Sequence, residues 1–409
     1  MVRSARVGGA VRRVFVRQRS AVVTKPTGNH TTRRFVVGSV LTVAVALSVA
    51  ACGSTSSSSS GGSATSAASG SSSTSGANVA LAKAGLAGVT GHADPFPVTE
   101  RLSKKLPAGS KFVYLEASDP IGALFATLLK PAVAAIGGKF IAIPAGETAQ
   151  SAQVAASTAI SEHPAVVLIP AFLPSEFGGK LQTLRSEGAN IVGAGMVGWK
   201  PYGIQWCVGC ERWTTGEGRV LADWVVANKG AQANAAFYTV PELGFTASMW
   251  QGFKSQMSEL CPKCAIRNVP IEYAAIGTTA PRTIVADLQS HSGTNVAVSS
   301  TMDMYQGLPA ALSSAGIHNV LTVGQSPTAE ILEDIKAGTL TAGLAVDLNT
   351  YVWTMVDAGG KLVIGQQPQA SEDGAPYQML GQKDITFNTQ AGWPGYPDFA
   401  ARFAKLWNP

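Results

Sequence analysis

Four cysteines form two Cys-x-x-Cys pairs, Cys207–Cys210 in the phrase WCVGC and Cys261–Cys264 in CPKC. This spacing suits three kinds of chemistry: a zinc site, a redox-active dithiol or two structural disulfides. Fifty residues separate the pairs, whereas ribbon-type zinc sites usually have about 15–20 residues between theirs. The spacing therefore favours a disulfide or a redox pair over zinc.

A second group of candidates lies in loops that follow short apolar runs. They are polar or aromatic residues that could hold a small molecule: Ser118, Asp119, Phe172, Trp199, Glu242, Asp303, Gln325 and Asp347. Asp119, Asp303 and Gln325 could hydrogen-bond a hydroxyl, an amine or an amide, and the aromatic rings could stack on a sugar or another ring. The structural alternative is that some of them cap helices or face solvent. Asp119, which precedes Pro120, is also typical of a helix start.

Motifs of the common enzyme classes are missing from the sequence. The Gly-Gly-Lys triplets at 137–139, 178–180 and 359–361 lack the following Ser or Thr and the upstream Gly of a phosphate loop. There is no His-Glu-x-x-His and, in the expected folded part, no Gly-x-Ser-x-Gly. The five histidines have no metal-ligand spacing. We therefore expect a binding protein rather than an enzyme, with no cofactor and no metal.

The net charge of +6 comes entirely from residues 1–51, which hold nine basic and no acidic residues. The remainder has 22 basic against 25 acidic residues, which argues against nucleic acid as a partner.

The apolar run 35–51 follows Arg33 and Arg34, as in an export signal. Val49-Ala50-Ala51-Cys52 resembles the bacterial lipobox. That resemblance implies that Cys52 is lipidated and anchors the chain to the outer face of the cell membrane; the alternative is a plain transmembrane anchor.

Residues 53–76 consist of Gly, Ser, Ala and Thr only, the composition of a flexible tether. We expect 1–51 to be a signal peptide and 52–110 to be the lipidated cysteine with its tether.

Outside the membrane thiols oxidise, which favours two structural disulfides. Of the three possible pairings we favour the local ones, Cys207–Cys210 and Cys261–Cys264. A thioredoxin-like redox site needs a strand before the motif and a helix at it, and we expect the next helix only near Gly216. Redox and zinc roles stay open.

From residue 111 onward, short apolar runs alternate with longer helical segments. Continuous apolar runs are typical of parallel strands covered on both faces. We expect such strands at 111–115, 140–143, 165–169 and 190–193, and again at 234–238, 267–271, 295–299, 319–323 and 341–345. The β-α alternation begins twice, so the expected fold is α/β with two doubly wound parallel-sheet lobes. Ligands of such sheets bind beyond the carboxyl ends of the strands.

Six phrases between residues 111 and 407 add a family resemblance. They are FVYLEASDPIGALFATLLKPAVAAIGG, AVVLIPA, KLQTLRSEGANIVGAG, WQGFKSQMSEL, TMDMYQGLPAALSSAGI and VLTVGQSPTAEILEDIKAGTLTAGL. In this order they resemble the type I periplasmic binding proteins of the ribose- and galactose-binding class. The resemblance implies two lobes joined by a multi-strand hinge, which capture a small solute and deliver it to ABC permease subunits. This sequence differs from the family at Thr301-Met302, where the family has Asn-Asp, and at Gln325, where the family has Asp. These changes favour another sugar or a less polar solute.

The resemblance also implies an assignment of segments to lobes. We expect 111–200 plus about 348–370 in the N-terminal lobe, and 201–347 plus about 371–409 in the C-terminal lobe. The expected function is that of an extracytoplasmic, monomeric substrate-binding lipoprotein of an ABC importer for a sugar or sugar-like solute. The alternatives are a solute-binding sensor that feeds a signalling receptor and an exported enzyme built on the same scaffold.

Overall fold

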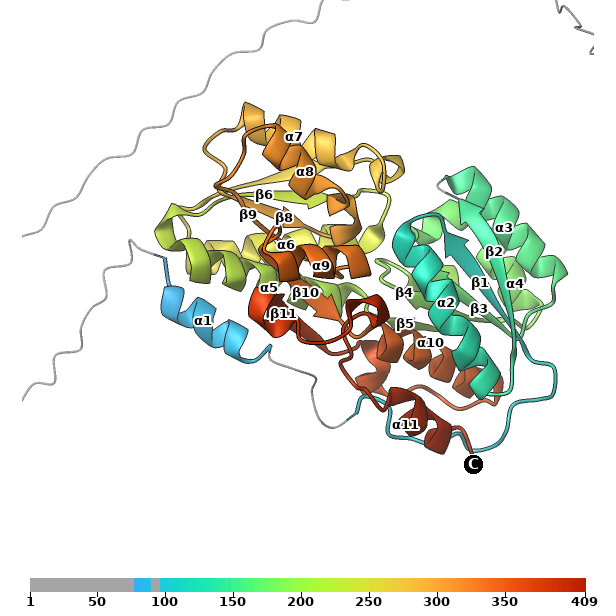
Figure 1. The fold of residues 1–409 in the computed structure, drawn as a ribbon. Coiled ribbons are helices and arrows are strands. Elements are labelled where there is room, and N and C mark those ends of the chain that lie inside the picture. The colour runs from blue at the N-terminus through green and yellow to red at the C-terminus, as the bar shows by residue number, and fades with distance from the viewer. Residues whose placement is uncertain (1–76, 90–95, 147) are drawn as a thin grey trace, which may run out of the picture. The chain divides into compact units, whose positions relative to one another are not determined.

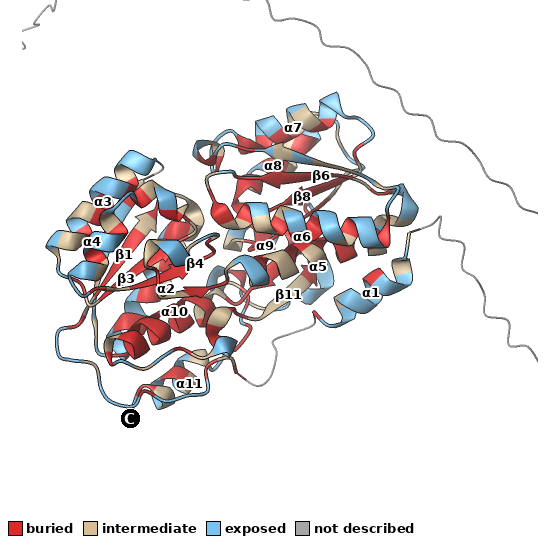
Figure 2. Cartoon of the chain, turned by 180° about the vertical axis from the view of Figure 1, so that it is seen from behind, coloured by how far each residue is buried: buried red, intermediate tan, exposed pale blue. Residues whose placement is uncertain are grey.

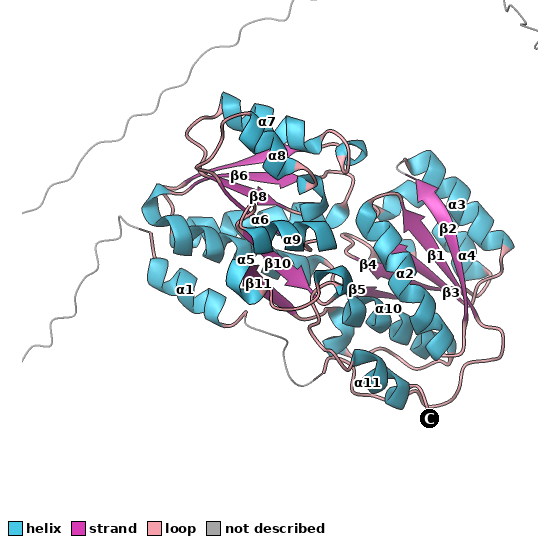
Figure 3. Ribbon diagram, in the orientation of Figure 1, coloured by secondary structure: helices cyan, strands magenta, loops and turns pink. Residues whose placement is uncertain are grey.

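The computed structural model describes residues 77–89, 96–146 and 148–409. Cys52, the expected export signal and residues 53–76 of the expected tether therefore lie outside the described residues. Two parallel β-sheets, each covered by helices on both faces, make up most of this part of the chain (Figures 1 and 3). None of the helices described combines the length and the apolar character that a membrane crossing needs. The expected α/β class with two parallel-sheet lobes is confirmed.

The first sheet has the strand order β2-β1-β3-β4-β5, and all its strands are parallel. Alternate side chains point to opposite faces of a strand: Phe112 and Tyr114 of β1 pack toward α2 and α10, whereas Val113 and Leu115 pack toward α3 and α4. Both faces are buried, which explains the continuous apolar runs (Figure 2). The bounds are β1 Lys111–Ala117, α2 Pro120–Ala135, β2 Lys139–Gly146, α3 Ala149–Ser161, β3 Val166–Pro170, α4 Lys180–Ser186, β4 Asn190–Ala194, β5 Trp206–Val208 and α10 Leu348–Val363.

The second sheet repeats this order with four parallel strands, β7-β6-β8-β9. Phe237 of β6 packs toward α5 and α6, and its neighbours Ala236 and Tyr238 pack toward α7, α8 and α9. The bounds are α5 Glu211–Lys229, β6 Asn234–Thr239, α6 Gly244–Leu260, β7 Ala265–Pro270, α7 Ala280–Ser290, β8 Val296–Ser299, α8 Leu308–Ser314, β9 Leu321–Gly324 and α9 Ala329–Ala337. β10, Ala342–Val346, pairs antiparallel with β11, Tyr377–Gly381.

Several segments pass between the two lobes and form the hinge. They lie at 208–211, 346–348, 364–376 and 393–396. The backbone N–H of Gly209 donates to the Asp373 carbonyl oxygen, and the N–H of Asp347 donates to that of Pro376 at 3.0 Å. These two bonds join neighbouring interlobe segments, so bending of one segment is coupled to bending of the segment that it is bonded to.

Two segments lie in a different lobe from the one the sequence suggested. β5, beyond the expected boundary at 200, pairs with β4 as the edge of the first sheet. The last helix, α11 Phe399–Leu406, packs against α10 of the N-terminal lobe rather than in the C-terminal one. Its Phe403 is fully buried, and the neighbouring Trp407 stacks on Trp353 of α10 with ring centroids 5.1 Å apart.

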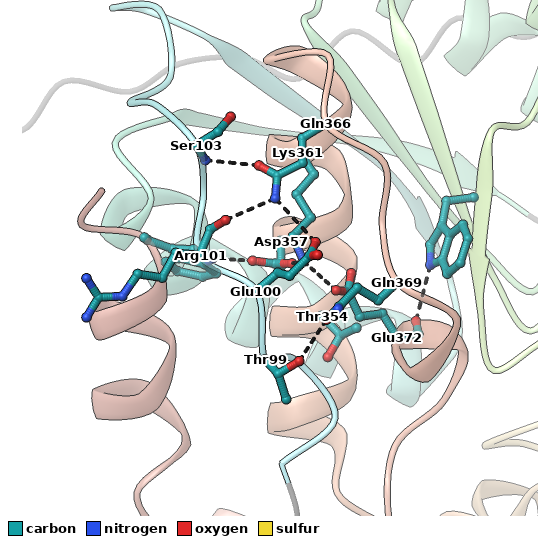
Figure 4. Close-up of polar contacts among 12 residues, drawn as sticks. Thr99, Glu100, Arg101, Ser103, Thr354, Asp357, Lys361, Gln366, Gln369 and Glu372 are labelled. Carbon is teal, nitrogen blue, oxygen red and sulfur yellow. Dashed lines mark hydrogen bonds and ion pairs between the residues drawn. The ribbon is translucent and has the colours of Figure 1, made fainter.

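α10 carries a fully buried ion cluster (Figure 4). The ammonium of Lys361 lies 2.8 Å from the Asp357 carboxylate and also contacts Glu372 on the hinge segment. Trp407 Nε1 donates to Asp357 Oδ1 at 2.6 Å. Burial and the neighbouring Asp357 raise the pKa of Glu372 to about 7. The cluster therefore joins α10, the hinge and the C-terminal end of the chain.

Residues 96–110, expected to be part of the flexible tether, are instead folded, with Phe96, Val98 and Leu102 buried. Amide side chains of the hinge segment that follows α10 hold them in place. Gln366 accepts from the Ser103 N–H at 3.0 Å and donates to the Arg101 carbonyl at 2.9 Å, while Gln369 accepts from the Thr99 hydroxyl at 2.9 Å (Figure 4). The preceding helix α1, Val79–Ala87, instead packs on α5 of the other lobe and buries Ala82 there.

α5 and α6 approach each other through two glycines. A Cβ on Gly218 would overlap the Met249 carbonyl of α6, and a Cβ on Gly252 would overlap the Thr215 carbonyl of α5. The contact is therefore backbone against backbone, which is closer than ordinary helix packing with side chains between the axes.

Both local disulfides are present, Cys207–Cys210 and Cys261–Cys264. The helix after the first pair differs from expectation: α5 begins at Glu211 with Cys210 as its N-cap, not near Gly216, and strand β5 precedes it and contains Cys207. The connection between β3 and β4 holds two short helical pieces, because Gly178, with a positive φ of 53°, separates a 3-10 turn at Pro174–Phe177 from α4.

Candidate functional site

A cavity lies between the two lobes. Its walls come from the carboxyl ends of β1, β3, β4 and β9, the turn after β8, and the first turns of α2, α5, α6 and α10. Most of the lining is apolar; the polar side chains are Asp119, Thr214, Thr301, Gln325, Ser326 and Tyr351, with Trp213 also in the wall. A mainly apolar lining with a few polar groups suits a small organic molecule.

Asp119 lies on the N-terminal lobe's side of the cavity and caps α2. Its Oδ1 accepts from the Gly122 N–H at 2.5 Å, and Pro120 is the first helical residue. Its own backbone N–H donates to the Tyr273 hydroxyl of the C-terminal lobe at 3.1 Å. Asp119 therefore has the helix-start role that its position before proline suggested, and it also lines the cavity and touches the opposite lobe.

Thr301 and Gln325 form the polar wall on the C-terminal lobe's side. The Thr301 hydroxyl donates to Asp303 Oδ1 at 2.6 Å, and Gln325 Nε2 donates to Glu217 Oε1 at 3.2 Å. Asp303 and Glu217 are each fully buried behind the lining residue that they bind. Sequence reasoning placed Asp303 in the site, whereas the structure places it one hydrogen bond behind it.

The two buried carboxyl groups have perturbed acidities. Burial, followed by the charge of Asp119, raises the pKa of Asp303 to about 7. Burial also raises the pKa of Glu217 well above its usual range, although the hydrogen bond from Gln325 acts in the opposite direction. Asp303 Oδ2 and Glu217 Oε2 accept no hydrogen bond from the described part of the chain.

Aromatic rings from four helices complete the cavity, and one of them is Phe245 of α6. Phe125 comes from α2, Trp213 from the first turn of α5 and Tyr351 from α10. The ring centroids of Trp213 and Tyr351 are 5.9 Å apart, and the Tyr351 hydroxyl donates to the Val208 carbonyl at 2.9 Å. That bond holds the Tyr351 ring in the wall beside the hinge.

Backbone strain also gathers at this site. Ala171 and Ser326, which both line the cavity, have positive φ values of 35° and 54°. Residues other than glycine rarely adopt this conformation, and it costs free energy that the surrounding structure has to compensate. Both follow the end of a strand, β3 or β9, where the chain turns along the cavity wall.

The other predicted site residues fall into two groups. Phe172 and Glu242 line a smaller cavity of about 280 Å³ beside the first, where Phe172 meets Phe177 edge to face and forms a β-bridge with Leu243. Ser118, Trp199 and Asp347 line neither cavity. Ser118 hydrogen-bonds Tyr273, Trp199 packs on the apolar core next to α4, and Asp347 caps α10 by accepting from the Thr350 N–H at 3.0 Å.

Sequence reasoning missed the aromatic residues and Glu217, because it searched only the loops after strands. Trp213 and Tyr351 lie in the first turns of α5 and α10, and Phe125 lies one turn farther into α2. Trp213, three residues after Cys210, could have been found if the helix had been expected to begin directly at the second cysteine. No signal in the sequence marks Glu217 as buried.

Among the described residues no cluster of histidine, cysteine, aspartate or glutamate could hold a metal ion, and both cysteine pairs form disulfides. The cavity offers carboxyl, hydroxyl and amide groups beside aromatic rings, a set that recognises a small molecule through hydrogen bonds and ring contacts.

Comparison with known proteins supports the fold. No protein-family model and no curated protein matches the chain. Solved structures do match: an ABC sugar transporter subunit from Rhodobacter sphaeroides 2.4.1 has a TM-score of 0.58 at 15% identity, covering 68% of this chain and 99% of that one. A Caulobacter myo-inositol binding protein bound to myo-inositol has a TM-score of 0.60 at 18% identity, covering 69% and 96%.

The same fold also occurs in a different functional setting. A LacI-type transcriptional regulator from Bacteroides fragilis, described as putative, has a TM-score of 0.57 at 14% identity and covers 68% of this chain and 98% of that one. At these identities the likeness establishes the fold alone, which is that of the type I periplasmic binding proteins. The expected resemblance is confirmed at that level.

Proposed function

We propose that the chain is the solute-binding component of an ABC importer, which captures a sugar or sugar-like small molecule between its lobes. The observation that carries the proposal is the cavity at the carboxyl ends of both sheets, walled by both lobes. The hydrogen-bonded connections beside it form a hinge, and closure about a hinge encloses a ligand and changes the surface shown to a partner. The solute leaves unchanged, so no catalytic group is required.

Solved neighbours support this choice: one is described as an ABC sugar transporter subunit, and two are described as ABC transporter solute-binding proteins with bound allitol or α-D-tagatopyranose. Their carbohydrate ligands suggest the solute class for this cavity without identifying its member. A sensor that feeds a signalling receptor would use the same cavity. Co-purification from membranes with permease subunits supports the importer, and co-purification with a receptor kinase supports the sensor.

The cavity predicts that a specific solute stabilises the protein against heat. At a hundredfold excess over its Kd, such a ligand adds about 2.7 kcal/mol to the free energy of unfolding. We expect a thermal-shift screen of sugars, polyols, amino acids and amines on the full chain to find it. Trp213→Leu should reduce the shift, whereas Trp199→Leu, a matched change outside the cavity, should leave it intact. If no small solute raises the Tm, capture in this cavity is refuted.

We also propose that the protein works on the outer face of the cell membrane, anchored through a lipidated Cys52. The supporting evidence is the apolar run 35–51 ahead of this cysteine. Cys52→Ser should move the exported protein from the membrane fraction to the soluble extracytoplasmic fraction, measured by fractionation and immunoblotting. Ser54→Ala serves as the control and should leave it in the membrane fraction. Retention of Cys52→Ser in the membrane would instead favour a transmembrane anchor.

A further inference from the structure

Carboxyl groups surround the cavity, and basic side chains are missing from its wall. Asp119 lines it directly, while Asp303 and Glu217 lie one hydrogen bond behind Thr301 and Gln325. No lysine, arginine or histidine is among the lining residues in the described part of the chain. A ligand carboxylate or phosphate would therefore find no cationic side chain to pair with.

The two buried carboxyl groups are incompletely satisfied. Asp303 and Glu217 are both completely shielded from solvent, and one oxygen of each accepts no hydrogen bond from the described residues. Leaving a buried carboxyl oxygen without a partner costs free energy. A positive group in the neighbouring cavity would recover part of that cost, because Coulomb attraction is strong where water is excluded.

The lining groups next to these carboxyls present acceptors to the cavity. The Thr301 hydroxyl proton is committed to Asp303, and the Gln325 amide donates to Glu217. What remains available on Thr301 is an oxygen lone pair, and on Gln325 the carbonyl oxygen and the second amide N–H. A ligand rich in N–H donors fits this pattern better than one rich in acceptors.

Helix N-termini supply the competing effect, because their partial positive charge attracts anions. α2, α5, α6 and α10 all begin at the cavity. α2 and α10 are capped by carboxylates: Asp119 accepts from the Gly122 N–H and Asp347 from the Thr350 N–H. These carboxylates offset the partial charges of α2 and α10, and α5 carries Glu211 in its first turn, whereas α6 has neither an acidic residue in its first turn nor a side-chain cap.

The aromatic rings supply the remaining part of a cation site. Trp213 and Tyr351 lie next to each other in the wall, with Phe125 also lining the cavity. Aromatic faces attract ammonium groups, and carboxylates combined with such faces are a recurrent arrangement for quaternary and primary amines. From the carboxyls, the acceptors and the rings together, we infer that the cavity selects a small organic cation, such as an amino sugar or another amine, over neutral and anionic solutes. This inference rests on the proposed function, in which the cavity holds the transported solute.

The acidities of the buried carboxyls are consistent with this choice. Burial raises the pKa of Asp303 to about 7 and that of Glu217 well above its usual range, so both groups hold protons readily while the cavity lacks a cation. A bound cation favours the ionised forms and releases protons, so the affinity for choline, whose charge does not titrate, should rise from pH 6 to pH 8. The titratable groups that face them are Asp119, near Asp303, and the hydroxyls of Tyr351 and Tyr377, near Glu217.

The test compares matched probes of different charge on the full chain. One series is D-glucosamine, D-glucose and D-glucuronate; the other is choline and its uncharged analogue 3,3-dimethylbutan-1-ol, with further amines, polyols and sugar acids in a wider thermal-shift panel. We expect the binders to be cations, at least about tenfold tighter than their neutral counterparts. A neutral or anionic solute that binds as tightly overturns the inference but leaves the proposed function standing. If nothing in the panel binds, the proposed function fails and the inference with it.

Charge-removing variants locate the effect. Glu217→Gln keeps the shape and removes the buried acid, so it should weaken cation binding about tenfold without lowering the Tm of the free protein. Asp303→Asn should act in the same direction if Glu217→Gln folds poorly. Glu330→Gln, an exposed residue of α9, controls for the change in net charge and should leave affinity unchanged. Undiminished cation affinity in the Glu217→Gln, Asp303→Asn double variant would overturn the inference.

Discussion

Replacing Lys361 with methionine should lower the free energy of unfolding by about 3–5 kcal/mol. The ammonium lies between the buried carboxylates of Asp357 and Glu372, and methionine keeps most of the side-chain volume while removing the charge. Two carboxyls would then face each other in a site with no water to solvate them. Urea denaturation followed by circular dichroism measures the loss.

A matched substitution at an exposed ion pair tests whether the loss of stability comes from the burial of the cluster or from removing a lysine charge as such. Lys336 on α9 is half exposed and lies 4.0 Å from Glu333, and exposed ion pairs contribute about 0–1 kcal/mol. Lys336→Met should therefore change stability only slightly. An equal loss for both variants would show that the buried cluster contributes nothing special, and a loss below about 1 kcal/mol for Lys361→Met would contradict the expectation.

Replacing Gly252 with alanine should lower the free energy of unfolding by about 3 kcal/mol or more. Overpacking a core typically costs about 1–3 kcal/mol, and this site lies at the upper end of that range. The added methyl group would overlap the Thr215 carbonyl of α5, which is backbone and cannot rotate away. α5 and α6 would have to separate, and the apolar contacts between them would weaken. The unfolding free energy in urea is again the measurement.

Gly216, in the same helix as Thr215, gives the opposite expectation. A Cβ there has as its nearest neighbour the Tyr377 hydroxyl oxygen at 3.7 Å, an ordinary contact distance. Glycine inside a helix costs about 0.5–1 kcal/mol relative to alanine, so Gly216→Ala should stabilise the protein by a similar amount. If both substitutions had the same sign and size, close packing of α5 on α6 would not be the cause.

Much of the fold could be predicted because the strands and helices carry local signals. β1 and β3 are apolar runs, and α2 begins at Asp119-Pro120, so the alternation was visible in the sequence. The start of α5 was missed because its N-cap, Cys210, makes no side-chain capping bond. The position of α11 could not be predicted, since its partners Trp353 and Phe96 are distant in sequence.

The residues of the site could be predicted only where their position directly after a strand places them at the cavity. Asp119 and Gln325 follow strands of parallel sheets, and both line the cavity. Phe172 and Asp347 follow strands too, yet Phe172 lines the smaller cavity and Asp347 serves as a helix cap. Which of these side chains faces a ligand depends on how the two lobes pack. Whether Asp119 and Gln325 contact the solute stays a prediction.

The lobe that the ribosome makes first is the last to become complete. Its sheet, 111–208, needs α10 at 348–363 and α11 at 399–406 to cover one face, and Trp407 closes the cluster around Asp357. The second sheet and its covering helices form one continuous stretch, 211–337. That stretch can assemble before 348–406 is made, whereas the face of the first sheet that α2 covers in part stays incomplete until α10 and α11 follow. We therefore expect the N-terminal lobe to be completed last, although it is synthesised first, and chaperones that hold nascent chains to act chiefly on it.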